Sequence, residues 1–473
     1  MEPNKALPAK DLCWRCEPEQ FDFTSTDDLD DLAQVIGQAR AVEAFTFGLA
    51  AEHTGYNVFA LGPEGIGRHT MARRFLDERA QRRPPPPDWC YVSNFKEPRA
   101  PQALSLPAGR GVRFQADMAR FVDDVQHALR SAFESEEYRT RRQVLEEEFK
   151  DRQEQALGQI EADGKERDIA LLRTPVGFAF APIAGGKVVS PQAFERLSES
   201  DRKRIEADIE ELQKRLHAVL RQAPAWMKEL RDKLRALNDE TAMFAVGYLV
   251  QSLHGQYADL PKIAAFLDEV RDDVIRNVEG IANLPEHAAT EGGAVEPQNG
   301  HPLMRRYRVN LLVDHSNTAQ APVVYEDDPS YDRLRGRIEH RAEMGALLTD
   351  LHMIRAGALH RANGGYLMID VRKVLTQPLA WEGLKQALLA GEIRIQPLAQ
   401  ALGLFSTVTL EPEPIPLDVK IVLVGERILY YLLSALDPEF DRLFKVAADF
   451  DEDIERKGEN DLFYARLVAT LAR

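Results

Sequence analysis

The feature that most constrains the fold is a glycine-rich turn between a short apolar stretch and a helical one. "YNVFAL" predicts a buried strand, and "HTMARRFLDERAQ" predicts a helix. Between them, "GPEGIGRHT" places glycines at Gly62, Gly65 and Gly67. A phosphate-binding loop requires this order of strand, turn and helix, because backbone N–H groups and the helix N-terminus together bind phosphate. The pattern predicts an α/β domain with a candidate nucleotide site.

The loop departs from the pattern G-x-x-x-x-G-K-[ST] at its two reactive positions. Arg68 stands where lysine is expected, and it keeps the charge without lysine's compact geometry. His69 replaces the hydroxyl that would bind Mg²⁺, and a hydroxyl follows only at Thr70. Three interpretations stay open: hydrolysis that uses Thr70, binding without hydrolysis, and a structural turn that binds nothing.

Further strand and helix signals return in the second half of the chain. The apolar runs "GYLMID" and "LDVKIVLVGE" end at Asp370 and Glu426, and helical segments lie between the strands. Such alternation predicts a parallel α/β sheet, to which we also assign "WCYVSNF" and "YRVNLLVDH". Asp370 is the candidate to support a metal ion, but Val371 stands where a neighbouring acid would orient the attacking water.

A long, highly charged segment interrupts the α/β pattern. We expect helices through "YRTRRQVLEEEFKDRQEQALGQIEADGKERDIALL" and "SESDRKRIEADIEELQKRLHAVL", forming an antiparallel coiled-coil arm. Between them, "TPVGFAFAPIAGGKVVSPQAF" predicts a β-hairpin tip near residues 174–194, turning at "AGGK". Phe178 and Phe180 in the tip are candidate substrate contacts, because exposed aromatic side chains often mark a contact surface. The apolar seam consists of Ile205, Ile209, Leu212, Leu216 and Val219 and, after Pro224, of Met227, Leu230, Leu234 and Leu237.

Four segments follow from these patterns. Residues 1–113 hold an N-terminal segment and the first part of the α/β domain, and residues 114–290 form the helical insertion. Residues 291–448 hold the second part of the α/β domain, and residues 449–473 begin a further helical subdomain.

Composition limits the classes of function. The chain has 473 residues and a formal net charge of −16, which argues against a general nucleic-acid-binding role. It has no apolar run long enough to span a bilayer and no apolar leader at its start, so we expect a cytoplasmic protein without a membrane partner. Cys13 and Cys16 form a single CxxC pair, which is weak evidence for zinc, and Cys90 is expected in a buried strand.

Several stretches, in order, resemble the AAA+ module of the Lon protease family in its LonB-like and LonC-like branches. They are "VIGQARAVEAFTFGLAAEHTGYNVFALGPEGIGR", "APVVYEDDPSYDRLRGRIEH", "IRAGALHRANGGYLMID" and "FDRLFKVAADFD". The resemblance covers roughly residues 20–110 and 300–470, and a coiled-coil insertion between them is also typical of the branch. It implies an AAA+-like P-loop sheet, with residues 449–473 as the start of a truncated helical lid.

The resemblance also implies roles for individual positions. The loop glycines and Arg68 correspond to the first nucleotide motif, with His69 a mismatch. Asp370 corresponds to the metal-supporting aspartate, and Glu426 lies near the residue that senses the γ-phosphate, usually Asn. Arg442 falls where an arginine finger would reach a neighbouring subunit's nucleotide, or it is a surface arginine in an ion pair. Val35, Ile36, Gly37 and Gln38 match a stretch that packs near the adenine, and Tyr325 and Tyr331 fall near an axial pore that grips polypeptide.

The family's activity defines the leading hypothesis and its alternatives. The resemblance implies a serine endopeptidase that degrades unfolded proteins in a hexameric ring, with a Ser–Lys dyad in a C-terminal domain that this chain does not contain. The degraded motifs suggest action independent of ATP. ATP or ADP with Mg²⁺ is the cofactor that the resemblance implies, and the alternative is that the chain binds no nucleotide. The alternatives are an active ATP-dependent unfoldase and a non-catalytic, chaperone-like scaffold ring.

Overall fold

The computed structural model divides the chain into two compact units. Unit 1 comprises residues 1–115 and 309–473, and unit 2 comprises residues 116–308. Among the described residues, no helix is both long enough and apolar enough to cross a membrane. The described residues are 8, 12, 19, 21–30, 37–174, 177–185, 187–284, 301–343, 346–403, 409–453 and 458–472.

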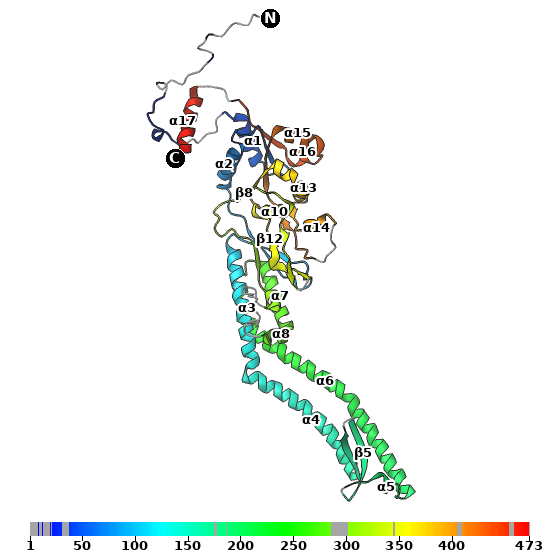
Figure 1. Ribbon diagram of the computed structural model, residues 1–473. Helices are drawn as coiled ribbons and strands as arrows, with labels where there is room; N and C mark the ends of the chain where they lie inside the picture. Colours follow the sequence, from blue (N-terminus) through cyan, green and yellow to red (C-terminus); the bar gives the residue numbers. More distant parts are fainter. Residues whose placement is uncertain are drawn as a thin grey trace. The chain divides into compact units, whose positions relative to one another are not determined.

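Unit 1, which carries the labels β8 and α13 in Figure 1, is built on a five-stranded sheet whose neighbouring strands are all parallel. The strands predicted at "YNVFAL", "GYLMID" and "LDVKIVLVGE" all belong to it, which confirms the predicted parallel α/β sheet. The strand before the glycine turn pairs on both sides, so the turn leaves from within the sheet. Across the sheet the order is β17 (Val446–Asp449), β1 (Val58–Leu61), β16 (Lys420–Gly425), β13 (Tyr366–Asp370) and β8 (Val323–Glu326).

The two faces of this sheet bury different helices. Val58 and Ala60 of β1 pack in a core with α1 (Ala39–Ala50) and α2 (Arg68–Ala80). The alternate residues Phe59 and Leu61 pack in a second core with α13 (Ala380–Ala390), α15 (Arg427–Leu436) and α16 (Phe440–Leu443). Side chains of a strand alternate between faces, so an unbroken apolar run such as "VFAL" is what a strand covered on both faces requires.

Two predicted strands lie outside the parallel sheet. β2 (Asp88–Val92), which contains the buried Cys90, and β7 (Asn310–Val313) join β3 (Gln102–Leu106) in an antiparallel sheet. Their assignment to the parallel sheet was wrong. The segment from Val92 to Gln102 is short and carries no helix, so β3 returns beside β2 in the opposite direction.

Shorter elements complete unit 1. They are η3 (Thr26–Asp28), α10 (Tyr331–Arg335), β9 (Arg337–Ile338), β10 (Arg341–Glu343), β11 (Ala346–Leu348), η4 (Leu351–Met353), β12 (Ile354–Arg355), α11 (Ala358–Arg361), α12 (Val371–Thr376), β14 (Glu392–Ile393), α14 (Leu398–Ala401), β15 (Ile415–Pro416) and α17 (Gly458–Ala472).

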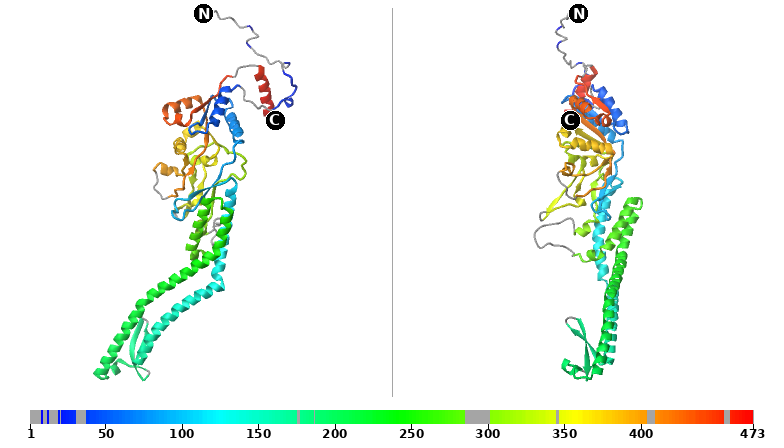
Figure 2. Two further views of the ribbon diagram at one scale, coloured as in Figure 1. Left: turned by 180° about the vertical axis from the view of Figure 1, so that it is seen from behind. Right: turned by 90° about the vertical axis from the view of Figure 1, so that its right-hand side faces the viewer.

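Unit 2 is dominated by two long helices that run side by side (Figure 2). They are α4 (Glu136–Glu166) and α6 (Glu199–Gln256), and α6 continues through Pro224 without interruption. Ion pairs join Arg141 to Glu240 at 2.7 Å and Arg152 to Glu229 at 3.0 Å. Residue numbers rise along one helix as they fall along the other, so the pair is antiparallel. The remaining helices are α3 (Arg110–Glu134), α5 (Pro191–Phe194), α7 (Pro261–Arg276), α8 (Val278–Ala282) and α9 (Pro302–Arg305).

The end of the helical pair differs from the prediction in two respects. We expected helix through "DIALL", but α4 stops at Glu166 and Asp168 adopts a left-handed conformation with φ 59°, which a short polar side chain tolerates. The tip is a three-stranded antiparallel sheet of β4 (Ile169–Thr174), β5 (Gly177–Ala184) and β6 (Lys187–Val188), rather than a single hairpin. Gly186 of the predicted turn lies outside the described residues.

Candidate nucleotide site

The glycine turn has the backbone of an anion-binding loop. Gly65 and Gly67 have φ angles of 84° and 81°, which L side chains rarely adopt, although a Cβ at either position would meet no atom within 4 Å. Gly67 is the N-cap of α2 and gives that helix no side-chain hydrogen bond. The first N–H groups of α2 therefore face the turn without a side-chain cap, as an anion-binding helix terminus requires.

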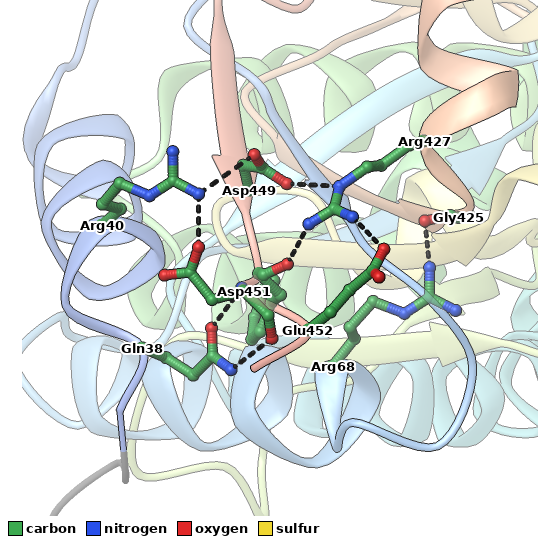
Figure 3. Close-up of polar contacts among 9 residues, drawn as sticks. Gln38, Arg40, Arg68, Gly425, Arg427, Asp449, Asp451 and Glu452 are labelled. Carbon is green, nitrogen blue, oxygen red and sulfur yellow. Dashed lines mark hydrogen bonds and ion pairs between the residues drawn. The ribbon is translucent and has the colours of Figure 1, made fainter. Parts of the chain in front are cut away.

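The guanidinium group of Arg68 forms a hydrogen bond within the protein. The residue is buried, and its Nη1 donates a hydrogen bond to the carbonyl oxygen of Gly425 at the end of β16 (Figure 3). Burial lowers the pKa of Arg68, while Asp370, Glu426 and Glu64 act in the opposite direction. The positive charge expected at a P-loop is therefore present, but the guanidinium group that carries it is hydrogen-bonded to a backbone carbonyl.

His69 faces the aspartate that should support a metal ion. Its Nε2 lies 3.8 Å from Oδ2 of Asp370, and its ring packs edge-on against Tyr325. Burial lowers the pKa of His69; Asp370 raises it, whereas Arg68 and Lys373 lower it further. The imidazole is therefore largely neutral at pH 7, and the contact with Asp370 is not a full ion pair.

The other acidic positions are also engaged within the protein. Asp370 is the N-cap of α12, where Oδ1 accepts a hydrogen bond from the Lys373 backbone N–H at 3.1 Å. Val371, at the position of the expected second acid, is fully buried in the core. Glu426 is paired with Arg372 at 2.6 Å. No acidic side chain occupies the second position, so the feature that would orient a water is missing there.

A group of charged residues beside the loop was not anticipated from the sequence. Arg427 bonds to Asp449 at 2.8 Å and pairs with Glu452, while Arg40 bonds to Asp451 at 2.5 Å (Figure 3). These residues tie α1 and α15 to the segment that follows β17. Phe450 in that segment donates to the carbonyl of Leu61 at 2.9 Å, so the segment passes next to the start of the glycine turn. The acidic run "DFDED" at the end of a predicted strand was the signal that could have identified it.

Gln38 is part of the same contact, and its neighbours in the sequence are only partly described. Its side-chain Nε2 donates to the carbonyl of Asp451 at 3.0 Å, and its Oε1 accepts from the Asp451 N–H at 2.7 Å. Gly37 is described, whereas Val35 and Ile36 lie outside the described residues, as do Cys13 and Cys16. The proposed role of this stretch near an adenine stays a prediction.

Of the remaining candidate residues, Tyr325 lies beside the glycine turn, where it packs against His69. Arg442 is exposed at the amino end of β17 and forms no ion pair with any described residue, contrary to the alternative in which it is a paired surface arginine. Tyr331 is 4% exposed and packs against Gly383, and its contact with substrate stays a prediction. Tyr325 is 39% exposed, and its hydroxyl donates to Asp327 at 3.2 Å.

The two phenylalanines of the tip are less exposed than predicted. Phe178 and Phe180 are half-buried and pack against Ile160, Leu212 and Leu216. They hold the tip sheet onto the helical pair, because a small sheet needs an apolar face to cover. Contact with substrate through their remaining exposed edges stays a prediction.

These residues do not fit Mg²⁺-dependent nucleotide hydrolysis. The hydroxyl that would bind Mg²⁺ is replaced by the imidazole of His69, which faces Asp370. The carboxylate of Asp370, expected to support the metal ion, caps α12. Arg68, expected to contact the phosphates, donates one of its N–H groups to the Gly425 carbonyl. Thr70 is exposed on α2 and lines a groove with Arg73 and Tyr325. Among the described residues, no group of three or more His, Cys, Asp or Glu side chains is arranged to hold a metal ion.

Comparison with known proteins identifies two family models. Residues 319–451 match a LonB-like AAA domain, and residues 88–121 match a Lon-like LonC helical domain. No curated protein matches the chain. Among solved structures, a crystal structure of NtrX from Brucella abortus is 18% identical, with 28% of this chain and 27% of that chain covered and a TM-score of 0.19, which is too low to indicate a shared fold. Two separate stretches of this chain are therefore similar to domains of the Lon protease family, one of them LonB-like and the other LonC-like.

Proposed function

We propose that this chain is the substrate-handling, AAA+-like portion of a Lon-type serine endopeptidase that degrades unfolded proteins without hydrolysing ATP. The observation that carries the proposal is the pair of replacements at the P-loop. Arg68 donates to the Gly425 carbonyl, and a His69 imidazole faces Asp370 where a hydroxyl and a metal ion would be expected. Without a motor, such an enzyme has no source of the roughly 5–15 kcal/mol that unfolding a domain requires.

Phosphate release tests the loss of hydrolysis directly. We expect the purified chain to release no phosphate from ATP with Mg²⁺ above the rate of buffer, and Asp370→Ala to leave that background unchanged. Lys373→Ala is a matched control, because Lys373 lies in α12 beside Asp370 but is not assigned to the metal. Magnesium-dependent release that Asp370→Ala abolishes would support the active unfoldase instead.

Restoring the motif tests whether the two replacements are responsible. We expect the double variant Arg68→Lys, His69→Thr to bind ATP with Mg²⁺ more tightly in calorimetry than the original chain does. The variant also frees the Gly425 carbonyl and removes the contact with Asp370. Equal or weaker binding in the folded variant would mean that the surrounding contacts, rather than these two residues, disable the site.

Proteolysis distinguishes the endopeptidase portion from a scaffold ring. The chain is assayed together with a peptidase domain that carries the Ser–Lys dyad, with casein as an unstructured substrate and a stably folded domain as its counterpart. We expect casein to be degraded at the same rate with and without ATP, and the folded domain to persist. Binding of casein without cleavage would favour the chaperone-like scaffold.

A further inference from the structure

Unit 1 contains a cavity at the edge of the parallel sheet opposite the glycine turn. Its volume is about 720 Å³, and it is lined by residues that precede β1, β16 and β17 and by Tyr366, the first residue of β13. The glycine turn, Asp370 and Glu426 all follow the carboxyl ends of the same strands. A strand of four or five residues spans roughly 13–17 Å, so the cavity is separate from the candidate nucleotide site.

We name this cavity the basic pocket, because its lining residues carry a net positive charge whereas the whole chain carries a net negative charge. The whole sequence has 76 acidic residues against 60 Lys and Arg. The pocket has the opposite balance, with Glu52 and Asp418 as its acidic side chains. Its basic side chains are Arg79, Arg82, Arg83, Lys420, Arg442 and Lys445.

Three of these arginines have no carboxylate partner among the described residues. Arg79, Arg82 and Arg83 come from the end of α2 and the residues after it, and none forms an ion pair with a described side chain. On the same helix, Arg73 and Arg74 pair with acidic residues one turn further on, at 3.8 and 3.1 Å. The carboxyl end of a helix favours cations. The carboxyl end of α2 does not account for Arg442, because Arg442 lies in α16, before β17. Arg442 also forms no ion pair with a described residue.

Lys420 supplies a positioned charge inside the pocket. Its ammonium donates to the backbone carbonyls of Ala51 at 2.7 Å and Tyr56 at 3.1 Å. Burial lowers the pKa of Lys420, as does Arg83, while Asp418 and Glu52 raise it. An ammonium has three donors, so the two carbonyls leave one N–H for a ligand.

One part of the lining is apolar, although His53, Thr54 and Asn57 add further polar side chains. Leu49 comes from α1, Leu388 and Leu389 come from α13, and Leu417 and Val419 come from the segment before β16. A recess of several hundred cubic ångströms with convergent polar groups has the size of a small-molecule site. The apolar residues would accept a part of the ligand that carries no charge.

We propose that the basic pocket binds a small molecule that carries two or more phosphate groups. Guanidinium groups present paired N–H donors that match phosphate oxygens, and several unpaired ones around a recess repel one another until an anion enters. The recessed form favours a small ligand over duplex nucleic acid, whose phosphates follow an extended surface. The proposal does not depend on whether the P-loop hydrolyses ATP.

Calorimetry on the full chain, in buffer without Mg²⁺, tests the proposal. We expect tripolyphosphate to bind saturably at one site per chain. The double variant Arg82→Gln, Arg83→Gln should weaken binding at least tenfold, because two contacts to phosphate are lost. Arg73→Gln, Arg74→Gln is the matched control: it makes the same charge change within α2, away from the pocket, and we expect an effect below twofold. Since Arg82 is exposed, Arg82→Gln alone serves if the double variant unfolds.

A second ligand distinguishes two sources of the same chemistry. ADP that binds more tightly than pyrophosphate would assign the apolar lining to a nucleoside, whereas equal affinity would assign the pocket to a bare phosphate chain. Either result supports the pocket, provided that binding depends on Arg82 and Arg83.

Chemical modification of arginine side chains in the protein without substitutions is an independent test of the proposed site. Tripolyphosphate should protect Arg79, Arg82 and Arg83 from phenylglyoxal, as mapped by mass spectrometry, and should leave Arg73 reactive. Three results overturn the proposal: no saturable binding at millimolar tripolyphosphate, equal weakening by the control pair, or protection of Arg68 in place of the pocket arginines. Tighter binding of duplex DNA than of tripolyphosphate, through the same arginines, would also overturn it.

Discussion

At the scale of single residues, the same charge has different consequences in different surroundings. Arg68 keeps the formal charge of a P-loop cation, yet its buried guanidinium donates to the Gly425 carbonyl. Arg79 and Arg83, on the same stretch of chain, are half-buried and form no ion pair with any side chain that the structure describes. Whether a basic residue can bind a ligand depends on whether acceptors within the protein already occupy its N–H groups. A sequence motif does not specify those acceptors.

His360 should make unit 1 sensitive to acid. It is fully buried in α11, its Nδ1 accepts from the Gly357 N–H at 3.2 Å, and its Nε2 has no hydrogen-bond partner in the described part of the chain. Burial, with a smaller contribution from Arg335, lowers the pKa of His360 from 6.5 to about 3. A folded-state pKa below the unfolded value means that the unfolded chain binds more protons, so stability falls as pH drops below 6.5.

The matched variant is His360→Asn, whose side-chain oxygen can replace Nδ1 as acceptor. Below about pH 6, we expect each pH unit to remove about 1.4 kcal/mol from the stability of the original protein, and markedly less from the variant. Thermal unfolding at several pH values measures the two slopes. Parallel slopes would show that His360 does not control the response.

At the scale of elements, the helical pair and its tip depend on a few fully buried contacts. Leu212 and Leu216 of α6 join Ile160 of α4 and Ile169 of β4 in one apolar cluster. Further along the pair, half-buried apolar side chains such as Leu145, Phe149 and Trp226 lie among exposed ion pairs, and exposed ion pairs contribute little. The order of the tip sheet therefore depends on this cluster.

Leucine truncations on α6 test that dependence. Leu212 is fully buried, whereas Leu220, two turns further along, is 43% exposed. We expect Leu212→Ala to cost about 2–5 kcal/mol locally and Leu220→Ala much less, because only the first leaves a cavity. Hydrogen exchange of the amides in β4 and β5 should accelerate by roughly 30-fold or more in the first variant. Equal acceleration in both would contradict a localised core.

The parts predicted correctly from the sequence are those encoded locally. β1, β13 and β16 are continuous apolar runs, and α2 follows glycines whose spacing defines the turn. β2 and β7 were recognised as strands, but their sheet depends on pairing between residues such as Cys90 and Leu311, which no local pattern reports. The contacts of Arg40 and Arg427 with the segment after β17 were missed for the same reason.

At the scale of the whole molecule, the family relationship raises the question of assembly. We propose a hexameric ring, in which Arg442 is positioned by α16 to face a neighbouring copy. Sedimentation at micromolar concentration should give a mass near six times 53.3 kDa. A species that stays monomeric across that range would contradict the ring.

Arg442→Ala separates assembly from motor function. If the ring works without hydrolysing ATP, the variant should degrade casein at the original rate when joined to the peptidase domain. A loss of activity that follows a loss of the hexamer would assign Arg442 to the interface. A loss of activity in an intact, ATP-dependent hexamer would support an arginine finger.

The pairing of β1 within the parallel sheet has a consequence for how the protein is made. Asn57, just before β1, accepts from the N–H of Ile421, and the two residues are 364 positions apart. At roughly 5–20 residues per second, the ribosome needs on the order of 20–70 seconds to produce one after the other. For that interval the apolar segment "VFAL" has emerged without its partner strands, and the intervening helical unit is completed first. Nascent chains of this protein should therefore require chaperone protection early in translation, and separating the two halves into different polypeptides should impair folding of unit 1 more than that of unit 2.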